Sequence, residues 1–166
     1  LPLLGKILNV LGAASSKLGT NAEISDLTQA LGVGLGTKFN VDDLRYDKII
    51  IMTDADVDGA HIAALLMTFF FTQMRPMIDH GHLYLACPPL FRVTQGAKRV
   101  YCLDEAEKNE ALAKGLGGKG KMDVSRFKGL GEMDAKDLKE TTMDVQSRKL
   151  IRVSIDEDEA GETGGR

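Results

Sequence analysis

The order of apolar and acidic segments between residues 48 and 86 limits this chain to few folds. Residues 48–53 (KIIIMT) contain an uninterrupted apolar run of strand length, typical of a strand buried on both faces of a parallel sheet. Residues 60–79 predict a long helix that is apolar nearly all round and kinked near Pro76, and residues 83–86 predict a second short buried strand. A strand, a crossover helix and a strand form a parallel βαβ unit, normally right-handed. The predicted fold class is therefore α/β, a parallel sheet flanked by helices.

The rest of the chain predicts a β-containing C-terminal extension. We expect, in order, a helix capped by Asn21 and ending at Gly32, a β pair at 91–93 and 99–101, a helix from a capping box at Asp104 and Glu107 through Ala113, a strand at 122–127, a helix from Asp134 and a last strand at 149–155. These elements suggest a core at residues 1–114, its C-terminal continuation at 115–155, and an acidic linker or tail at 156–166.

Composition excludes several classes of protein. With 43% hydrophobic and 27% charged residues among 166, the chain resembles an ordinary soluble domain. The longest apolar stretch, residues 62–71, has about half the length of a membrane span, and no signal peptide is visible. Cys87 and Cys102 have no zinc-ligand spacing. We therefore expect a cytoplasmic protein without a membrane partner, and a piece of a longer chain.

Charge is unevenly distributed along the sequence. The net charge is −3, but residues 156–166 carry −4 and residues 114–155 carry +4. A basic segment of this kind is compatible with nucleic-acid binding and equally with an ordinary solvated surface.

The acidic loop Asp54-Ala55-Asp56-Val57-Asp58-Gly59 directly follows the first predicted strand. Ligands of open α/β sheets gather at the carboxyl ends of strands. Carboxylates two residues apart in an extended chain lie roughly 7 Å apart and repel by about 2 kcal/mol at an effective dielectric near 20. Mg²⁺, which takes one or two carboxylates plus phosphate oxygens, relieves that repulsion. Asp54, Asp56 and Asp58 are therefore candidate Mg²⁺ ligands; the alternative is a solvated turn that caps the next helix.

Other functions that use acidic or glycine-rich motifs agree less well with this sequence. A calcium-binding loop counted from Asp54 would have Leu65 where glutamate is needed, and it follows a strand instead of a helix. An aspartyl phosphatase would need a lysine and a second acidic pair that we do not find. The glycines at 115, 117 and 120 have the spacing of a dinucleotide-binding motif, but they follow a helix instead of a strand. The same segment approaches a P-loop, but Met122 stands where a P-loop needs Ser or Thr. A Mg²⁺-dependent phosphodiester-transfer site, which needs one more carboxylate from another strand, remains.

Three segments resemble a known family. Residues 52–62 (MTDADVDGAHI), together with 2–10 (PLLGKILNV) and 126–133 (RFKGLGEM), are similar to the TOPRIM region of bacterial type IIA DNA topoisomerase B subunits. Residues 141–144 (TTMD) extend the match to roughly residues 1–155. Phe127, Met52 and the lack of a large insertion before Arg126 favour topoisomerase IV over gyrase. The chain departs from the family pattern at Leu4, Leu11 and Val145.

The resemblance implies a TOPRIM (Rossmann-like) fold and a role in DNA cleavage and religation. In the family, the acidic triplet and a glutamate of a Glu-Gly-Asp-Ser-Ala segment hold Mg²⁺ at the scissile phosphate; we expect that segment upstream of Leu1. Asp54 and Asp56 match the principal ligands and Asp58 a nearby or alternate one. Lys6 and Asn9 match positions near DNA, and His61 and Lys128 are further DNA-binding candidates, each of which could instead be an ordinary surface or packing residue.

The resemblance also implies partners. An A subunit would supply the attacking tyrosine in a heterotetramer, ATP would bind outside this region, and double-stranded DNA would be the substrate, in the cytoplasm at the nucleoid. The region alone would then be inactive, because it holds no complete catalytic set. A gyrase B subunit, a TOPRIM primase or nuclease, and a non-catalytic docking module remain as alternatives.

Overall fold

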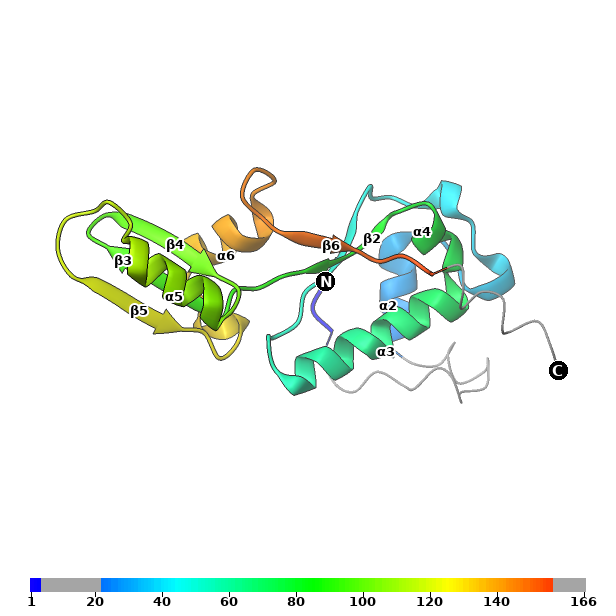
Figure 1. Ribbon diagram of the computed structural model, residues 1–166. Coiled ribbons are helices and arrows are strands. Elements are labelled where there is room, and N and C mark those ends of the chain that lie inside the picture. Colours follow the sequence, from blue (N-terminus) through cyan, green and yellow to red (C-terminus); the bar gives the residue numbers. More distant parts are fainter. Residues whose placement is uncertain (4–21, 157–166) are drawn as a thin grey trace. The chain divides into compact units, whose positions relative to one another are not determined.

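In the computed structural model, residues 1–3 and 22–156 are described (Figure 1). The chain forms two units, each assembled from segments that are separate in the sequence. The first unit comprises Leu1–Ile51, His61–Leu85 and Arg152–Arg166, and the second comprises Met52–Ala60 and Ala86–Ile151. The predicted domain boundaries at residues 114 and 155 stay a prediction.

The first unit contains the predicted βαβ arrangement. Strand β1 (Ile49–Ile51) pairs in parallel with β2 (Leu83–Ala86), and helix α3 (Val57–Gln73) connects them. A third strand, β6 (Leu150–Arg152), lies on the other side of β2, which gives the order β1-β2-β6. Helix α2 (Ala22–Leu31) and two short 3₁₀ turns, η1 (Gly36–Lys38) and η2 (Val41–Asp43), precede β1. The predicted α/β class is confirmed.

The long apolar helix predicted at 60–79 is in fact two helices. Met74 leaves the helical region, with φ −139°, and α4 (Arg75–Asp79) begins beyond it with Pro76 in its first turn. A proline fits the first turn of a helix because its missing N–H would have no partner there. Burial is also one-sided: Phe69 and Phe70 are buried, whereas Ile62 and Phe71 are exposed. A helix that is apolar nearly all round suggests a place inside the core, but only one side of α3 is buried in this chain.

The hydrophobic core of the first unit is formed by the apolar sides of its helices and strands. Its buried residues come from α2, α3, α4, β1 and β2, and from two positions beside the helices, Val33 and Met74: Ile24, Leu31, Val33, Ile51, Ala63, Leu66, Phe69, Phe70, Met74, Met77, Ile78 and Leu83. Within residues 1–3 and 22–156, no helix combines the length and the apolar character that crossing a bilayer would require.

The second unit is built on an antiparallel sheet. Strands β3 (Phe91–Gln95), β4 (Lys98–Cys102) and β5 (Met122–Arg126) have the order β4-β3-β5, and helix α5 (Glu105–Lys114) lies between β4 and β5 in the chain. The Asp104 side chain caps α5 by accepting the Glu107 N–H at 2.9 Å, as predicted. Phe91, Val93 and Cys102 are buried with the side chains of α5. This unit supplies the β-containing part predicted for the chain.

The segment after β5 is a series of short turns. It contains η3 (Leu130–Glu132), α6 (Ala135–Leu138) and the π-helix η4 (Lys139–Met143), and it leads to β6. Asp134 and Asp137 form a capping box at the start of α6, where a helix was predicted. The last strand is shorter than the predicted range of 149–155.

Candidate functional site

Asp56 holds the start of helix α3. Its Oδ1 accepts the Gly59 N–H at 2.6 Å, and its main-chain carbonyl accepts the Ala60 N–H at 3.0 Å. This is the arrangement of an N-cap, so Asp56 stabilises the helix whether or not it also binds a ligand. The cap also explains why α3 begins at Val57, three residues before the predicted start. It uses one of the two carboxylate oxygens.

Asp54 joins the acidic loop to a second sequence motif. Its Oδ1 accepts the Leu130 N–H at 2.8 Å, across 76 residues of chain. Gly129 lies directly against the same carboxylate: a Cβ on Gly129 would stand 3.0 Å from Asp54 Cγ and Oδ1 and 3.1 Å from Oδ2. The fold therefore brings together the acidic loop and residues 128–132, which the sequence analysis could relate only by family resemblance.

Gly59 is required by the packing of the loop on itself. A Cβ there would lie 1.9 Å from the Asp54 carbonyl oxygen, far closer than any side chain allows, and 3.0 Å from Asp56 Oδ1, a tight contact. The sequence analysis did not single out this glycine, although a glycine that closes an acidic triplet is the signal that could have identified it.

The other candidates are placed as follows. Asp58 is exposed in the first turn of α3, and His61 is exposed further along the same helix. Lys128 is exposed, and its main-chain N–H donates to Glu132 Oε2 at 2.8 Å. Lys6 and Asn9 lie outside the residues that the structure describes.

The three aspartates do not form a ready-made metal cage. Within residues 1–3 and 22–156, no group of three or more His, Cys, Asp or Glu side chains is arranged to hold a metal ion. The donor chemistry nevertheless fits Mg²⁺, because Asp54 and Asp56 on the loop and Asp58 in the first turn of α3 all offer carboxylate oxygens and are exposed. Mg²⁺ in proteins keeps several waters and commonly takes only one or two carboxylates together with substrate phosphates. A site completed by a bound phosphate is compatible with this loop.

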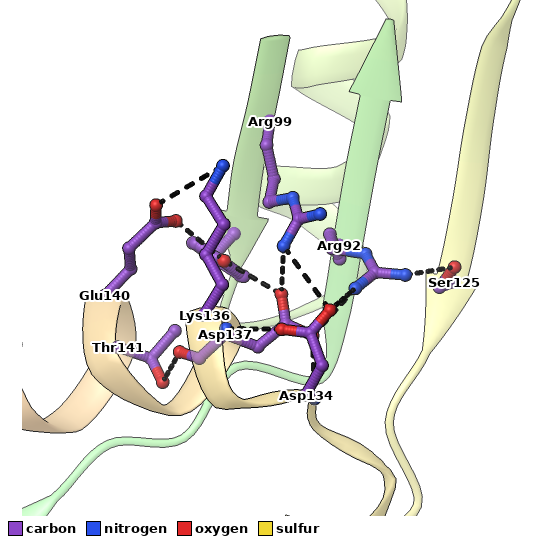
Figure 2. Close-up of polar contacts among 9 residues, drawn as sticks. Arg92, Arg99, Ser125, Asp134, Lys136, Asp137, Glu140 and Thr141 are labelled. Atoms are coloured by element: carbon purple, nitrogen blue, oxygen red, sulfur yellow. Dashed lines mark hydrogen bonds and ion pairs between the residues drawn. The ribbon is translucent and has the colours of Figure 1, made fainter. Parts of the chain in front are cut away.

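A polar network that the sequence analysis missed lies in the second unit (Figure 2). The carboxylate of Asp137, which is 0% exposed, accepts hydrogen bonds from Arg92 Nη1 and Arg99 Nη1 at 2.7 Å each. It also accepts the Tyr101 hydroxyl at 2.9 Å, and that hydroxyl lies 2.8 Å from Glu140 Oε2. Register explains the convergence, since Arg92 lies opposite Tyr101 and Arg99 opposite Thr94 on one face of the β3–β4 hairpin.

The network sets the charge state of its members. Burial alone would raise the pKa of Asp137, but the hydrogen bonds from Tyr101 and Arg92 and the positive charge of Arg92 hold it below the ordinary value. The pKa of Tyr101 is raised, first by burial. Asp137 is therefore a buried anion neutralised by two guanidinium groups. The signal in the sequence was the pair of arginines within a predicted hairpin.

A cavity of about 280 Å³ lies beside this network, with Arg99, Tyr101 and Glu140 in its wall together with Cys87 and Lys149. The first three of these side chains already bond to one another through Asp137 and the Tyr101 hydroxyl. Burial raises the pKa of the Cys87 thiol, which makes it a poor nucleophile near neutral pH.

The glycine-rich segment 115–120 packs against strand β3. Gln95 accepts the Leu116 N–H at 2.9 Å through Oε1 and donates through Nε2 to the Gly120 carbonyl at 3.0 Å. A Cβ on Gly118 would lie 2.1 Å from the Gln95 carbonyl oxygen. These glycines allow a close approach to the hairpin, in agreement with the interpretation of this segment as a loop.

Comparisons with known proteins match both ends of the chain. The family model described as the Toprim domain matches residues 1–88, and the model for the DNA gyrase B subunit, carboxyl terminus, matches residues 119–164. The DNA topoisomerase 4 B subunit of Bartonella bacilliformis is 57% identical over 163 residues, which is 98% of this chain and 24% of the relative. The protein of the same name in Caulobacter vibrioides is 57% identical over 155 residues, or 93% of this chain and 22% of the relative.

Gyrase B subunits also match. The one from Metamycoplasma hominis is 47% identical over 157 residues, which is 95% of this chain and 24% of that protein. The chain thus spans about a quarter of the length of the curated relatives it matches.

Proposed function

Because the chain belongs to the TOPRIM family, we propose that it is part of the DNA cleavage and religation core of a bacterial topoisomerase IV B subunit. The resemblance found in the sequence to B subunits of type IIA topoisomerases is confirmed by the family models and by relatives that are 57% identical. Identities of 52–57% to topoisomerase 4 proteins, against 47% to a gyrase protein, favour topoisomerase IV.

One observation carries the proposal for the site. The hydrogen bond from the Leu130 N–H to Asp54 joins the acidic loop to the Lys128–Glu132 segment, the two motifs on which the resemblance depends. Gly129 also packs against the same carboxylate. The meeting of the two motifs supports a shared role at one functional centre.

The residues of this chain would bind and orient a cation and the DNA backbone. Asp54 and Asp56 would hold Mg²⁺, with Asp58 as a nearby or alternate ligand. Bound Mg²⁺ neutralises charge on the phosphate and on the leaving oxygen. Lys6, Asn9, His61 and Lys128 would contact DNA. Lys128 is an exposed cationic side chain suited to a phosphate, and phosphate contacts position a protein without reading sequence.

The remaining parts of the reaction belong to other regions. We propose that an A subunit supplies the tyrosine that attacks the scissile phosphate, in a heterotetramer, and that ATP binds elsewhere in the full-length protein. The activity would be ATP-dependent double-strand passage, with decatenation and relaxation of DNA, in the cytoplasm at the nucleoid.

Asparagine substitutions in the full-length protein, assembled with its A subunit, test the proposal. Asp54→Asn or Asp56→Asn should abolish Mg²⁺-dependent cleavage and decatenation and leave ATP binding intact, because each removes a charge at the cation site only. Asp123→Asn, at an exposed aspartate of β5, is the matched control and should decatenate normally. Normal decatenation by both site variants would refute the assignment.

A further inference from the structure

We propose that the Gly129–Leu130 segment positions the Asp54 carboxylate for the cation. This inference rests on the proposed function, since it assigns a role toward the same cation site. The Leu130 N–H binds Oδ1 at 2.8 Å, so Oδ2 would be the oxygen offered to a cation. Hydrogen bonds from outer groups to ligating carboxylates fix their orientation, and their loss typically weakens metal binding 10–100-fold.

The segment is held firmly enough to serve this purpose. It lies between two buried side chains, Phe127 and Met133, and the Phe127 N–H donates to the Leu90 carbonyl at 2.9 Å. The Glu132 carboxylate closes the turn by accepting the Lys128 N–H at 2.8 Å. Because both ends are anchored in the second unit, the Leu130 N–H has a fixed direction.

The anchoring continues into the buried network. The Asp134 N–H, directly after Met133, donates to the Asp137 carboxylate at 3.2 Å, and Asp137 is bound by Arg92 and Arg99 of the sheet. Asp54 is therefore tied to the β3–β4 hairpin through one turn and one buried carboxylate. The buried network therefore helps to hold residues 128–132, and with them the Asp54 carboxylate, in place.

Gly129 and Gly131 provide a matched pair of variants within this turn. A Cβ on Gly129 would meet the Asp54 carboxylate at 3.0 Å, whereas a Cβ on Gly131 would meet nothing within 4 Å. Gly129 has extended backbone angles, φ −169° and ψ 174°, which any residue can adopt. Gly129→Ala should therefore displace the Asp54 side chain, whose atoms are the nearest to that Cβ, and Gly131→Ala should displace nothing.

Leu130 provides a second, independent test. It is the first residue of a 3₁₀ turn and follows an extended residue, so a proline there fits both its own position and that of its neighbour. Leu130→Pro removes the N–H that binds Asp54. Leu130→Ala keeps that N–H and reports the effect of the side chain alone.

The assay is titration of the 166-residue chain with Mn²⁺, followed by water proton relaxation, with thermal melting to verify folding. We expect Gly129→Ala to bind Mn²⁺ about tenfold more weakly than Gly131→Ala, and Leu130→Pro about tenfold more weakly than Leu130→Ala. In an Asp54→Ala background, Leu130→Pro should weaken binding no further, because the bond it removes is already absent. If Leu130→Pro does not fold, the glycine pair decides.

The outcomes separate this inference from the proposed function. If Asp54→Ala binds Mn²⁺ as tightly as the unmodified chain, Asp54 is not a ligand, and both proposals fail. If Asp54→Ala weakens binding while the two members of each pair bind equally, Asp54 remains a ligand and the positioning role is overturned.

Discussion

Substitution of Asp137 by asparagine should destabilise the second unit by about 3 kcal/mol. The side chain is fully buried and neutralises two guanidinium groups at 2.7 Å each. Removing one partner of a buried ion pair costs about 3–5 kcal/mol. The lower end applies here because the arginine side chains retain 22% and 24% exposure. An asparagine would also turn an N–H donor toward other donors, so it cannot replace the carboxylate.

Native-state hydrogen exchange of the β3 and β4 amides is the appropriate assay, because it reports on the second unit separately from the first. A destabilisation of about 3 kcal/mol corresponds to more than a hundredfold faster exchange. Lys136→Ala in the same helix is the control: its Nζ lies 3.9 Å from Glu140 and the lysine side chain is 62% exposed, so we expect less than about 0.5 kcal/mol. Exchange in Asp137→Asn that is less than fivefold faster, or no faster than in Lys136→Ala, would refute this reasoning.

Acid titration, a glycine substitution, a charge reversal and a plasmid assay test other parts of the structure. Folding lowers the pKa of Asp137, so the ionised carboxylate stabilises the fold at pH values above the ordinary pKa of 3.8, and this stabilisation disappears as the pH falls below that value. The difference in free energy of unfolding between the unmodified chain and Asp137→Asn should therefore become smaller in acid. Gly59→Ala should cost about 2–3 kcal/mol in urea unfolding, because its Cβ meets the Asp54 backbone; an unchanged midpoint would contradict the packing. In the assembled enzyme, Lys6→Glu should weaken DNA binding and reduce the log–log salt slope by about 0.9 for each phosphate that is no longer neutralised; an unchanged slope would make Lys6 an ordinary surface residue. Finally, the chain alone with supercoiled plasmid and Mg²⁺ should produce neither nicks nor covalent adducts on a denaturing gel, and adducts would show that it carries its own nucleophile.

Local patterns in the sequence determined most of the secondary structure. The apolar run before Asp54, the long apolar segment and the run at 83–86 predict β1, the crossover helices and β2, because burial of these residues leaves few other arrangements. Capping residues located the starts of α5 and α6. The errors lie at the ends of elements, and the last strand is shorter than predicted. Asp56 begins α3 earlier than the apolar pattern indicates, and Met74 separates α3 from α4 where only a kink was expected.

The contacts that define the candidate site depended on tertiary structure. Asp54 and Leu130 are 76 residues apart, and no local sequence pattern predicts that the Leu130 N–H will donate to the Asp54 carboxylate. Asp137 likewise gathers arginines that lie 45 and 38 residues away, because strand register places both on one face of a hairpin. The sequence identified the acidic loop by its charge and by its place after a strand. The groups that orient the loop are main-chain N–H donors. Every residue except proline carries such a donor, so only the fold determines which of them point at the loop.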